Sequence, residues 1–172
     1  MATSAELLVD GFGRIRENVV SVLDGLTPEQ LAGQVGPGAN PVSWLVWHLT
    51  RVQDDHVADA FGVPQVWSSA GWAARFGLPA GMTDHGYGHS AEQVADVAAA
   101  TADAGLLAEY HEQVYAQTLK LVSDVTDAGL DRVVDTRWTP HVTLAVRLVS
   151  VLDDDMQHVG QAAYVRGMLL RG

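Results

Sequence analysis

The sequence contains no cysteine, which excludes disulfide bonds, thiolate metal sites and a cysteine nucleophile. Any metal chemistry must therefore use histidine, aspartate and glutamate. Basic residues are also scarce, with 10 Lys and Arg against 21 Asp and Glu. The resulting formal net charge of -11 repels phosphate backbones, so we expect no binding to nucleic acid.

Long apolar runs are absent as well. No uninterrupted apolar run reaches the roughly 18 residues of a membrane span, so no membrane insertion is expected. The N-terminus lacks the basic start and the apolar centre of a signal peptide. The 172 residues, 48% of them hydrophobic, suffice for one well-formed core. The sequence therefore predicts a single cytoplasmic domain over residues 1–172.

Helical periodicity is the main signal that the chain does contain. Apolar residues recur at three- and four-residue steps in several stretches, and no alternating stretch is long enough for a sheet. We expect four main helices: one from Ser4 to about Gly25, one from Pro41 (capped by Asn40) to about Phe61, one from Ser90 to about Thr126 with a break near Ala104, and one from Leu144 to Leu170. Four amphipathic faces are buried most simply in an all-α, antiparallel four-helix bundle.

Residues 62–89, between the second and third helices, have no persistent period and are rich in glycine, proline and aromatics. Structureless loops beyond roughly 12–15 residues are uncommon in compact domains. We therefore predict a folded insertion with short helical turns, or a lid over a site. Trp67 and Trp72 lie inside it and are candidates for the wall of a pocket.

The last helix carries three consecutive aspartates followed by His158. Asp154 and His158 are four residues apart, so on a helix their side chains point the same way, one turn apart. Such a pair suits zinc, nickel, iron or manganese. A metal site needs a third ligand from another element. His48 is the best candidate, because it lies mid-helix at the border of an apolar stripe.

Simpler alternatives stay open for these residues. A histidine on an apolar face is more often a hydrogen-bonded core residue than a ligand, and the acidic run can be a solvated face. Asp55 lies two turns after His48, too far to share its metal, and is a solvated charge, a partner of Arg51 or an acceptor behind the ligands. Arg147, seven residues before Asp154, either neutralises an acid or binds an anionic substrate group.

The other histidines give weaker signals. His85 and His89 are four residues apart, but the two glycines between them argue against a helix. They line a site only if the insertion folds over it. His111 and His141 look like ordinary surface or connector residues.

Two motifs resemble those of the DinB-like superfamily: NPVSWLVWHL in the second helix and DDDMQHVGQAAYVRG in the last. The resemblance covers nearly the whole chain and is strongest to the branch with mini-circle proteins, mycothiol-dependent maleylpyruvate isomerases and bacillithiol transferases. It implies a four-helix bundle whose metal is held by one histidine of the second helix and a His-x-x-x-His pair in the last. These positions fall on His48, Asp154 and His158, so an aspartate stands at the first position of the pair.

The resemblance implies a metal-dependent enzyme that acts on a small molecule. Aspartate still ligates a divalent cation, with zinc or nickel expected, but its charge reduces the Lewis acidity of the metal. In thiol-transferase members the metal activates a low-molecular-weight thiol of the mycothiol type. The residues expected to line the substrate pocket are Trp44, Asp55, Arg147, Gln161, Trp67 and Trp72.

The competing hypothesis is a non-catalytic binding or stress-related bundle. In that case Asp154 and His158 form a structural pair and no metal is bound. Dimers through bundle faces are common in such folds, and a homodimer is plausible under either hypothesis.

Overall fold

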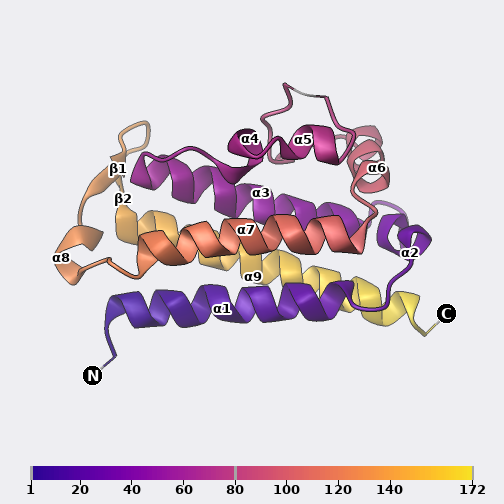
Figure 1. Cartoon of the computed structure of the whole chain (residues 1–172), viewed down its shortest axis with the longest axis horizontal. Helices are drawn as coiled ribbons and strands as arrows, with labels where there is room; N and C mark the ends of the chain where they lie inside the picture. Colours follow the sequence, from indigo (N-terminus) through magenta and orange to yellow (C-terminus); the bar gives the residue numbers. More distant parts are fainter. Residues whose placement is uncertain (1, 80, 172) are drawn as a thin grey trace.

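The computed structural model describes residues 2–79 and 81–171. In these residues four long helices form a bundle (Figure 1): α1 (Ser4–Leu23), α3 (Val42–Phe61), α7 (Ala104–Val122) and α9 (Leu144–Leu169). The prediction of an all-α bundle is confirmed. Two short strands, β1 (Val133–Asp135) and β2 (Val142–Thr143), pair as an antiparallel ribbon immediately before α9.

Side-chain caps fix where the outer helices begin. Thr3 and Glu6 form a capping box at the start of α1, and Thr143 accepts the backbone N–H of Val146 at the start of α9. A second capping box at Thr27 starts the short α2 (Pro28–Ala32). These threonines satisfy backbone donors that would otherwise have no partner.

Of two helix boundaries near the site, one differs from the sequence prediction and one agrees with it. Asn40 does not cap the second helix, because Pro41 itself occupies the cap position of α3, without a side-chain hydrogen bond. The expected break near Ala104 is present: α6 (Ala91–Ala100) ends, and Asp103 caps α7 by accepting the backbone N–H of Leu106. The predicted third helix is therefore two helices.

The long helices do not simply alternate in direction. In Figure 1, α1 and α9 run from left to right, whereas α3 and α7 run from right to left. α3 packs most extensively on α9, antiparallel to it, and lies parallel to α7. Since α7 begins at the end of the bundle where α3 also begins, the chain between them must return along the length of α3. A helix of 20 residues is about 30 Å long, which explains why the intervening segment is long.

We call residues 62–103 the return segment. Its described part contains α4 (Val66–Ser69), α5 (Trp72–Arg75) and α6, which lie above α3 and at one end of the bundle in Figure 1. α8 (Asp127–Leu130) closes the opposite end. The prediction of a folded insertion with short helical turns agrees with this segment as far as the structure describes it.

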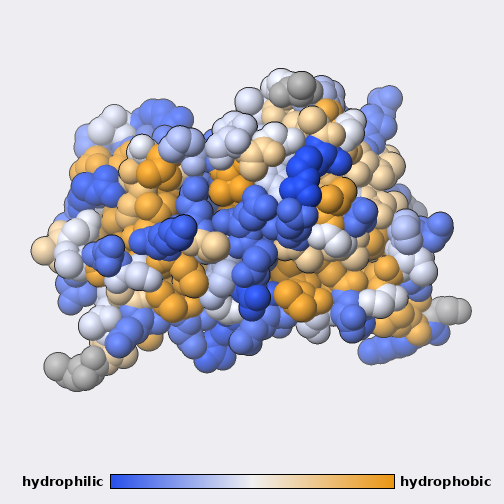
Figure 2. Space-filling view, in the orientation of Figure 1, coloured by the Kyte–Doolittle hydropathy of each residue, from blue (hydrophilic) through white to orange (hydrophobic). Residues whose placement is uncertain are grey.

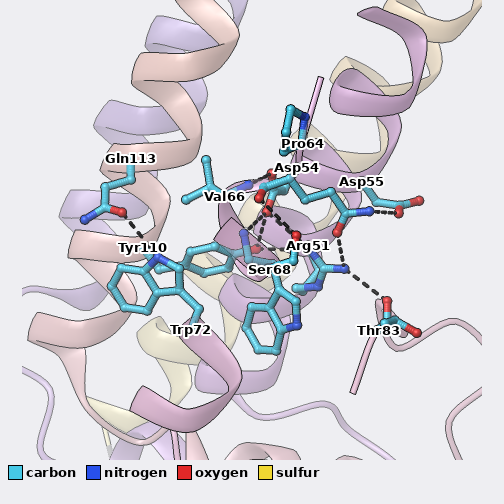
Figure 3. Close-up of polar contacts among 12 residues, drawn as sticks. Arg51, Asp54, Asp55, Pro64, Val66, Ser68, Trp72, Thr83, Tyr110 and Gln113 are labelled. Atoms are coloured by element: carbon cyan, nitrogen blue, oxygen red, sulfur yellow. Dashed lines mark hydrogen bonds and ion pairs between the residues drawn. The ribbon is translucent and has the colours of Figure 1, made fainter. Parts of the chain in front are cut away.

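Arg51 of α3 forms hydrogen bonds that hold the return segment against the bundle (Figure 3). Its side chain is fully buried, and its guanidinium donates to Asp54, to the hydroxyl of Tyr110 on α7 and to Gln65. It also donates to the backbone carbonyls of Thr83 and Asp84. The buried guanidinium of Arg51 therefore connects α3 and α7 to two parts of the return segment: Gln65 near its start, and Thr83 and Asp84 in its middle.

Asp54 is the buried counterion of this cation. Its carboxylate lies 3.3 Å from Arg51 Nη1 and accepts the backbone N–H groups of Val66 and Trp67 at 2.8 and 2.7 Å. Burial raises the pKa of Asp54, while these two N–H groups and Arg51 act in the opposite direction. The hydrogen bonds compensate for placing a charge in the core.

The surface carries both polar and apolar groups. Figure 2 shows hydrophilic side chains across the middle of one face and hydrophobic ones gathered toward its two ends. Among the described residues, no helix is long and apolar enough to cross a membrane.

Candidate metal centre

The structure brings together the three residues that were predicted to bind a metal. His48 comes from the middle of α3, and Asp154 and His158 come from successive turns of α9, the helix that packs most extensively on α3. One ligand atom of each lies within 4.8 Å of the others. The two imidazole rings meet edge to face with their centroids 4.6 Å apart. We call His48, Asp154 and His158 the triad.

Hydrogen bonds behind the triad orient both imidazoles. Nδ1 of His48 donates to the backbone carbonyl of His85, and Nδ1 of His158 donates to Oε1 of Gln161 at 2.9 Å. Because an oxygen acceptor requires a proton on Nδ1, Nε2 of each ring keeps its lone pair. Such outer contacts fix the tautomer and direction of histidine ligands in metal sites.

His48 is held neutral by its surroundings. Only 5% of the residue is exposed, and Trp44 stacks on its ring at 4.7 Å with an interplanar angle of 12°. Burial lowers the pKa of His48 to about 4. A neutral imidazole is the form that binds metal ions, so no proton has to be displaced near pH 7.

Asp154 lacks the hydrogen bond that a structural pair would need. Its Oδ1 lies 3.7 Å from Nε2 of His158, which is beyond hydrogen-bonding distance. Its Oδ2 is buried and has no hydrogen-bond partner among the described residues. Burial raises the pKa of Asp154, opposed chiefly by His158. Two imidazole nitrogens and an unpartnered carboxylate oxygen are a donor set that fits zinc or nickel.

The neighbouring aspartates have different environments. Asp153 is exposed and accepts from Gln157 at 2.8 Å. Asp155 is fully buried, neither of its oxygens has a partner among the described residues, and burial raises its pKa well above the usual range. The three acids are therefore not a uniform solvated face, and burial favours the neutral form of Asp155.

Comparison with known proteins identifies the family of the chain. Residues 7–170 match the family model described as mycothiol-S-transferase. The chain belongs to the mycothiol S-transferase family. This is a DinB-like family, so the resemblance seen in the two helical motifs is confirmed. A crystal structure of a conserved protein from Enterococcus faecalis is similar with a TM-score of 0.89 and 29% identity, covering 100% of each chain. No curated protein matches the sequence significantly.

In this member of the mycothiol S-transferase family, the return segment passes over His48 of the triad at Gly86. Gly86 has a φ of +95°, and a Cβ built there would lie 2.9 Å from Trp47, 3.0 Å from Trp44 and 3.0 Å from Nδ1 of His48. His89 stacks on Trp47 nearby. His85 and His89 were expected to line a site only if the insertion folds over it. The path of the return segment meets this condition.

Replacing Gly86 with alanine should displace this loop and remove the carbonyl that orients His48. We expect metal affinity to fall about 10- to 100-fold, the usual effect of losing a contact behind a ligand, together with a lower melting temperature. Isothermal titration with zinc measures the first effect and calorimetry the second. The control is Gly88→Ala, which has a similar φ of +76° but nothing within 4 Å. Equal zinc affinity in the two variants would contradict this role of Gly86.

A cavity of about 830 Å³ lies between α3, the return segment and β1; no triad residue lines it, and His85, whose carbonyl contacts His48, is its link to the triad. Asp55, Trp67 and His85 are among its lining residues. Asp55 accepts from Gln65 and is not the partner of Arg51, which bonds to Asp54. Of the expected pocket residues, Asp55 and Trp67 thus line this cavity.

The other expected pocket residues have different roles. Arg147 forms an ion pair with Asp135 at 2.9 Å, so it neutralises an acid. Gln161 orients His158 and lines a separate groove, and Trp44 covers His48. Trp72 is fully buried and does not line the cavity, because Tyr110, Phe76 and Arg75 enclose its ring.

Sequence reasoning missed His56 as a site residue, and it placed His85 at a site only on the condition that the insertion folds over it. His56 follows Asp55 in α3 and its ring lies 5.7 Å from that of His85. Burial and then Arg147 lower the pKa of His56. The HGYGHS sequence hinted at His85, but only the path of the return segment brings it to α3.

Proposed function

We propose that this protein binds a divalent cation, zinc or nickel, through His48, Asp154 and His158 and uses it to transfer a low-molecular-weight thiol of the mycothiol type to a small molecule. The main observation behind the proposal is that His48, Asp154 and His158, which come from two helices, each place one ligand atom within 4.8 Å of the others. The family of the chain supports the thiol. A bound divalent ion would lower the pKa of a coordinated thiol, so that sulfur reacts as the thiolate.

The chain's own residues would position the reactants. The carbonyl of His85 and the amide of Gln161 aim the two imidazoles at a common point. Trp44 and Gly86 keep water away from the inner side of His48. The cavity of about 830 Å³, which shares His85 with the surroundings of His48, is large enough for a small-molecule substrate.

A non-catalytic bundle with a structural pair of Asp154 and His158 is the second candidate. The separation of 3.7 Å between Asp154 and His158 weighs against it. So does the unpartnered Oδ2 of Asp154, since buried polar atoms are normally hydrogen-bonded.

The test is a measurement of bound metal in protein purified without a histidine tag. Mass spectrometry should find zinc or nickel in the wild type, and this metal should be lost in His48→Ala and in His158→Ala. Adding zinc to metal-free wild type at about 100 times its dissociation constant should stabilise it by about 2.7 kcal/mol. His141→Ala is the control, because this exposed histidine lies in the connector before α9.

Activity is tested with a mycothiol-type thiol and a chromogenic electrophile. Conjugation should require metal and should disappear in His158→Ala. Wild-type protein that carries no metal, and whose melting temperature does not respond to zinc or nickel, would exclude the proposal and favour the non-catalytic bundle.

A further inference from the structure

A second group of potential ligands lies next to the triad. One ligand atom each of Asp55, His56 and His85 falls within 4.8 Å of the others. Two of them come from α3, about two helical turns beyond His48, and the third comes from the return segment. All three line the cavity of about 830 Å³, and none belongs to the triad.

The hydrogen bonds of Asp55, His56 and His85 leave some of their metal-binding atoms available. Asp55 accepts from Gln65 through Oδ1, while its Oδ2 faces Nδ1 of His56 at 3.4 Å. Nη1 of Arg147 lies 3.4 Å from the same Nδ1, which leaves Nε2 of His56 for a ligand. Nδ1 of His85 is buried and has no hydrogen-bond partner among the described residues. A buried polar atom without a partner, at the wall of a polar cavity, indicates a ligand that the protein side chains do not supply.

The charge of the cavity selects for a cation. Its carboxylates are Asp55, Asp59 and Asp135. Asp135 is already paired with Arg137 at 2.8 Å and with Arg147 at 2.9 Å, and these contacts hold its pKa well below the usual range. Asp55 and Asp59 have no arginine within ion-pairing distance among the described residues. Three carboxylates thus face the two guanidiniums of Arg137 and Arg147, and one negative charge remains at the cavity wall.

We propose that Asp55, His56 and His85 bind a second divalent cation, separate from the one held by the triad. Two imidazoles and one carboxylate form a donor set typical of zinc and other first-row metals. Tetrahedral ligands about 2.1 Å from zinc lie about 3.4 Å apart, so small side-chain rotations from the 4.8 Å limit bring the donors together. The cavity leaves space for water or substrate at the remaining position.

His85 connects this second site to the triad. Its backbone carbonyl orients His48, while its imidazole binds the second cation. Asp154 also interacts electrostatically with both His56 and His85. The second cation would thereby hold the loop that carries Gly86 against the triad. The second site does not depend on the proposed chemistry of the first.

Metal stoichiometry tests the second site. Metal-free protein is dialysed to equilibrium against zinc, and bound zinc is counted by mass spectrometry. We expect two equivalents in the wild type and one in Asp55→Asn, which keeps an oxygen for Gln65, and in His85→Gln, which keeps the backbone carbonyl for His48. His158→Ala should also bind one equivalent, at the second site. Cobalt absorption spectra should differ between His85→Gln and His158→Ala, since each retains a different site.

Asp59→Asn is the matched control, because it removes a charge from the same cavity outside the proposed ligands. It should still bind two equivalents. Circular dichroism checks that each variant is folded. A single equivalent in the wild type, lost in His158→Ala and retained in His85→Gln, would overturn the second site and leave the proposed function standing. A single equivalent with the opposite pattern would support the second site and reject the triad, and no bound zinc would reject both.

Discussion

Replacing Asp54 with alanine is expected to lower the free energy of unfolding by about 3–5 kcal/mol, the cost of leaving a buried charge without its partner. Arg51 and Asp54 are both fully buried, and the carboxylate also accepts two backbone N–H groups at the start of α4. The variant leaves Arg51, the two N–H groups and the Tyr110 hydroxyl, which also donates to Asp54, short of an acceptor. Urea denaturation of metal-free protein measures the loss.

The control for this prediction is Asp10→Ala, which breaks the exposed ion pair between Asp10 and Arg14 on α1. Exposed pairs four residues apart on a helix contribute little to stability, because water and salt screen them. If Asp54→Ala costs no more than Asp10→Ala, the buried pair does not hold the return segment in place.

The Asp54 variant should also weaken the metal centre. Arg51 donates to the carbonyls of Thr83 and Asp84, immediately before the His85 carbonyl that orients His48. Without Asp54 the guanidinium of Arg51 can move, and it no longer holds the loop at Thr83 and Asp84 in place. The stability of the core and the geometry of the triad therefore depend on the same buried cation.

The sequence predicts the bundle and the triad because both follow from short-range spacing. An interval of four residues on one helix places Asp154 beside His158, and the apolar stripe of α3 turns His48 inward. The DinB-like motifs supplied the pairing of these two helices. Threonine caps such as Thr143 are equally local signals.

The direction of α7 could not be predicted in the same way. Periodicity reports that a helix exists and which face it buries, but not at which end of the bundle it starts. The return along α3 depends on contacts between distant residues, such as Arg51 with Thr83. The position of His85, and with it the second group of ligands, follows from this path.

The different environments of adjacent acidic residues were also difficult to predict from the sequence. Asp54 and Asp55 differ by one position, which on a helix is a rotation of about 100°. The first is buried against Arg51, and the second lines the cavity. Composition cannot distinguish them, whereas the structure assigns one to stability and the other to the candidate cation site.

His111 was expected at the surface, and this prediction is wrong. It is 1% exposed, because it lies on the same face of α7 as Leu107 and Val114, four residues after one and three before the other. Its Nδ1 is 3.1 Å from the hydroxyl of Thr50, which itself donates to the carbonyl of Val46. The spacing of His111 from Leu107 and Val114 already indicated a buried position, but the polarity of histidine led to a prediction of exposure.

Acidification should therefore destabilise the wild type relative to a His111→Gln variant. Burial lowers the pKa of His111 to about 4, whereas histidine in an unfolded chain has a pKa near 6.5. Above about pH 6.5 neither state is protonated, and the two proteins should keep a constant difference. As the pH falls from about 6.5 to about 4, only the unfolded wild type takes up the proton, so its free energy of unfolding falls. The loss should approach about 3 kcal/mol and then level off.

Urea denaturation of metal-free wild type and variant across this pH range measures the effect. His48 and His56 also have lowered pKa values, but both proteins contain them, so their contribution cancels in the difference. The nearby Arg16 keeps its charge throughout the range and adds only a constant repulsion of the protonated imidazole. If the difference between the two proteins is independent of pH, His111 is protonated as easily in the folded chain as in the unfolded one. The buried imidazole would then have access to water that its surroundings in α7 do not provide.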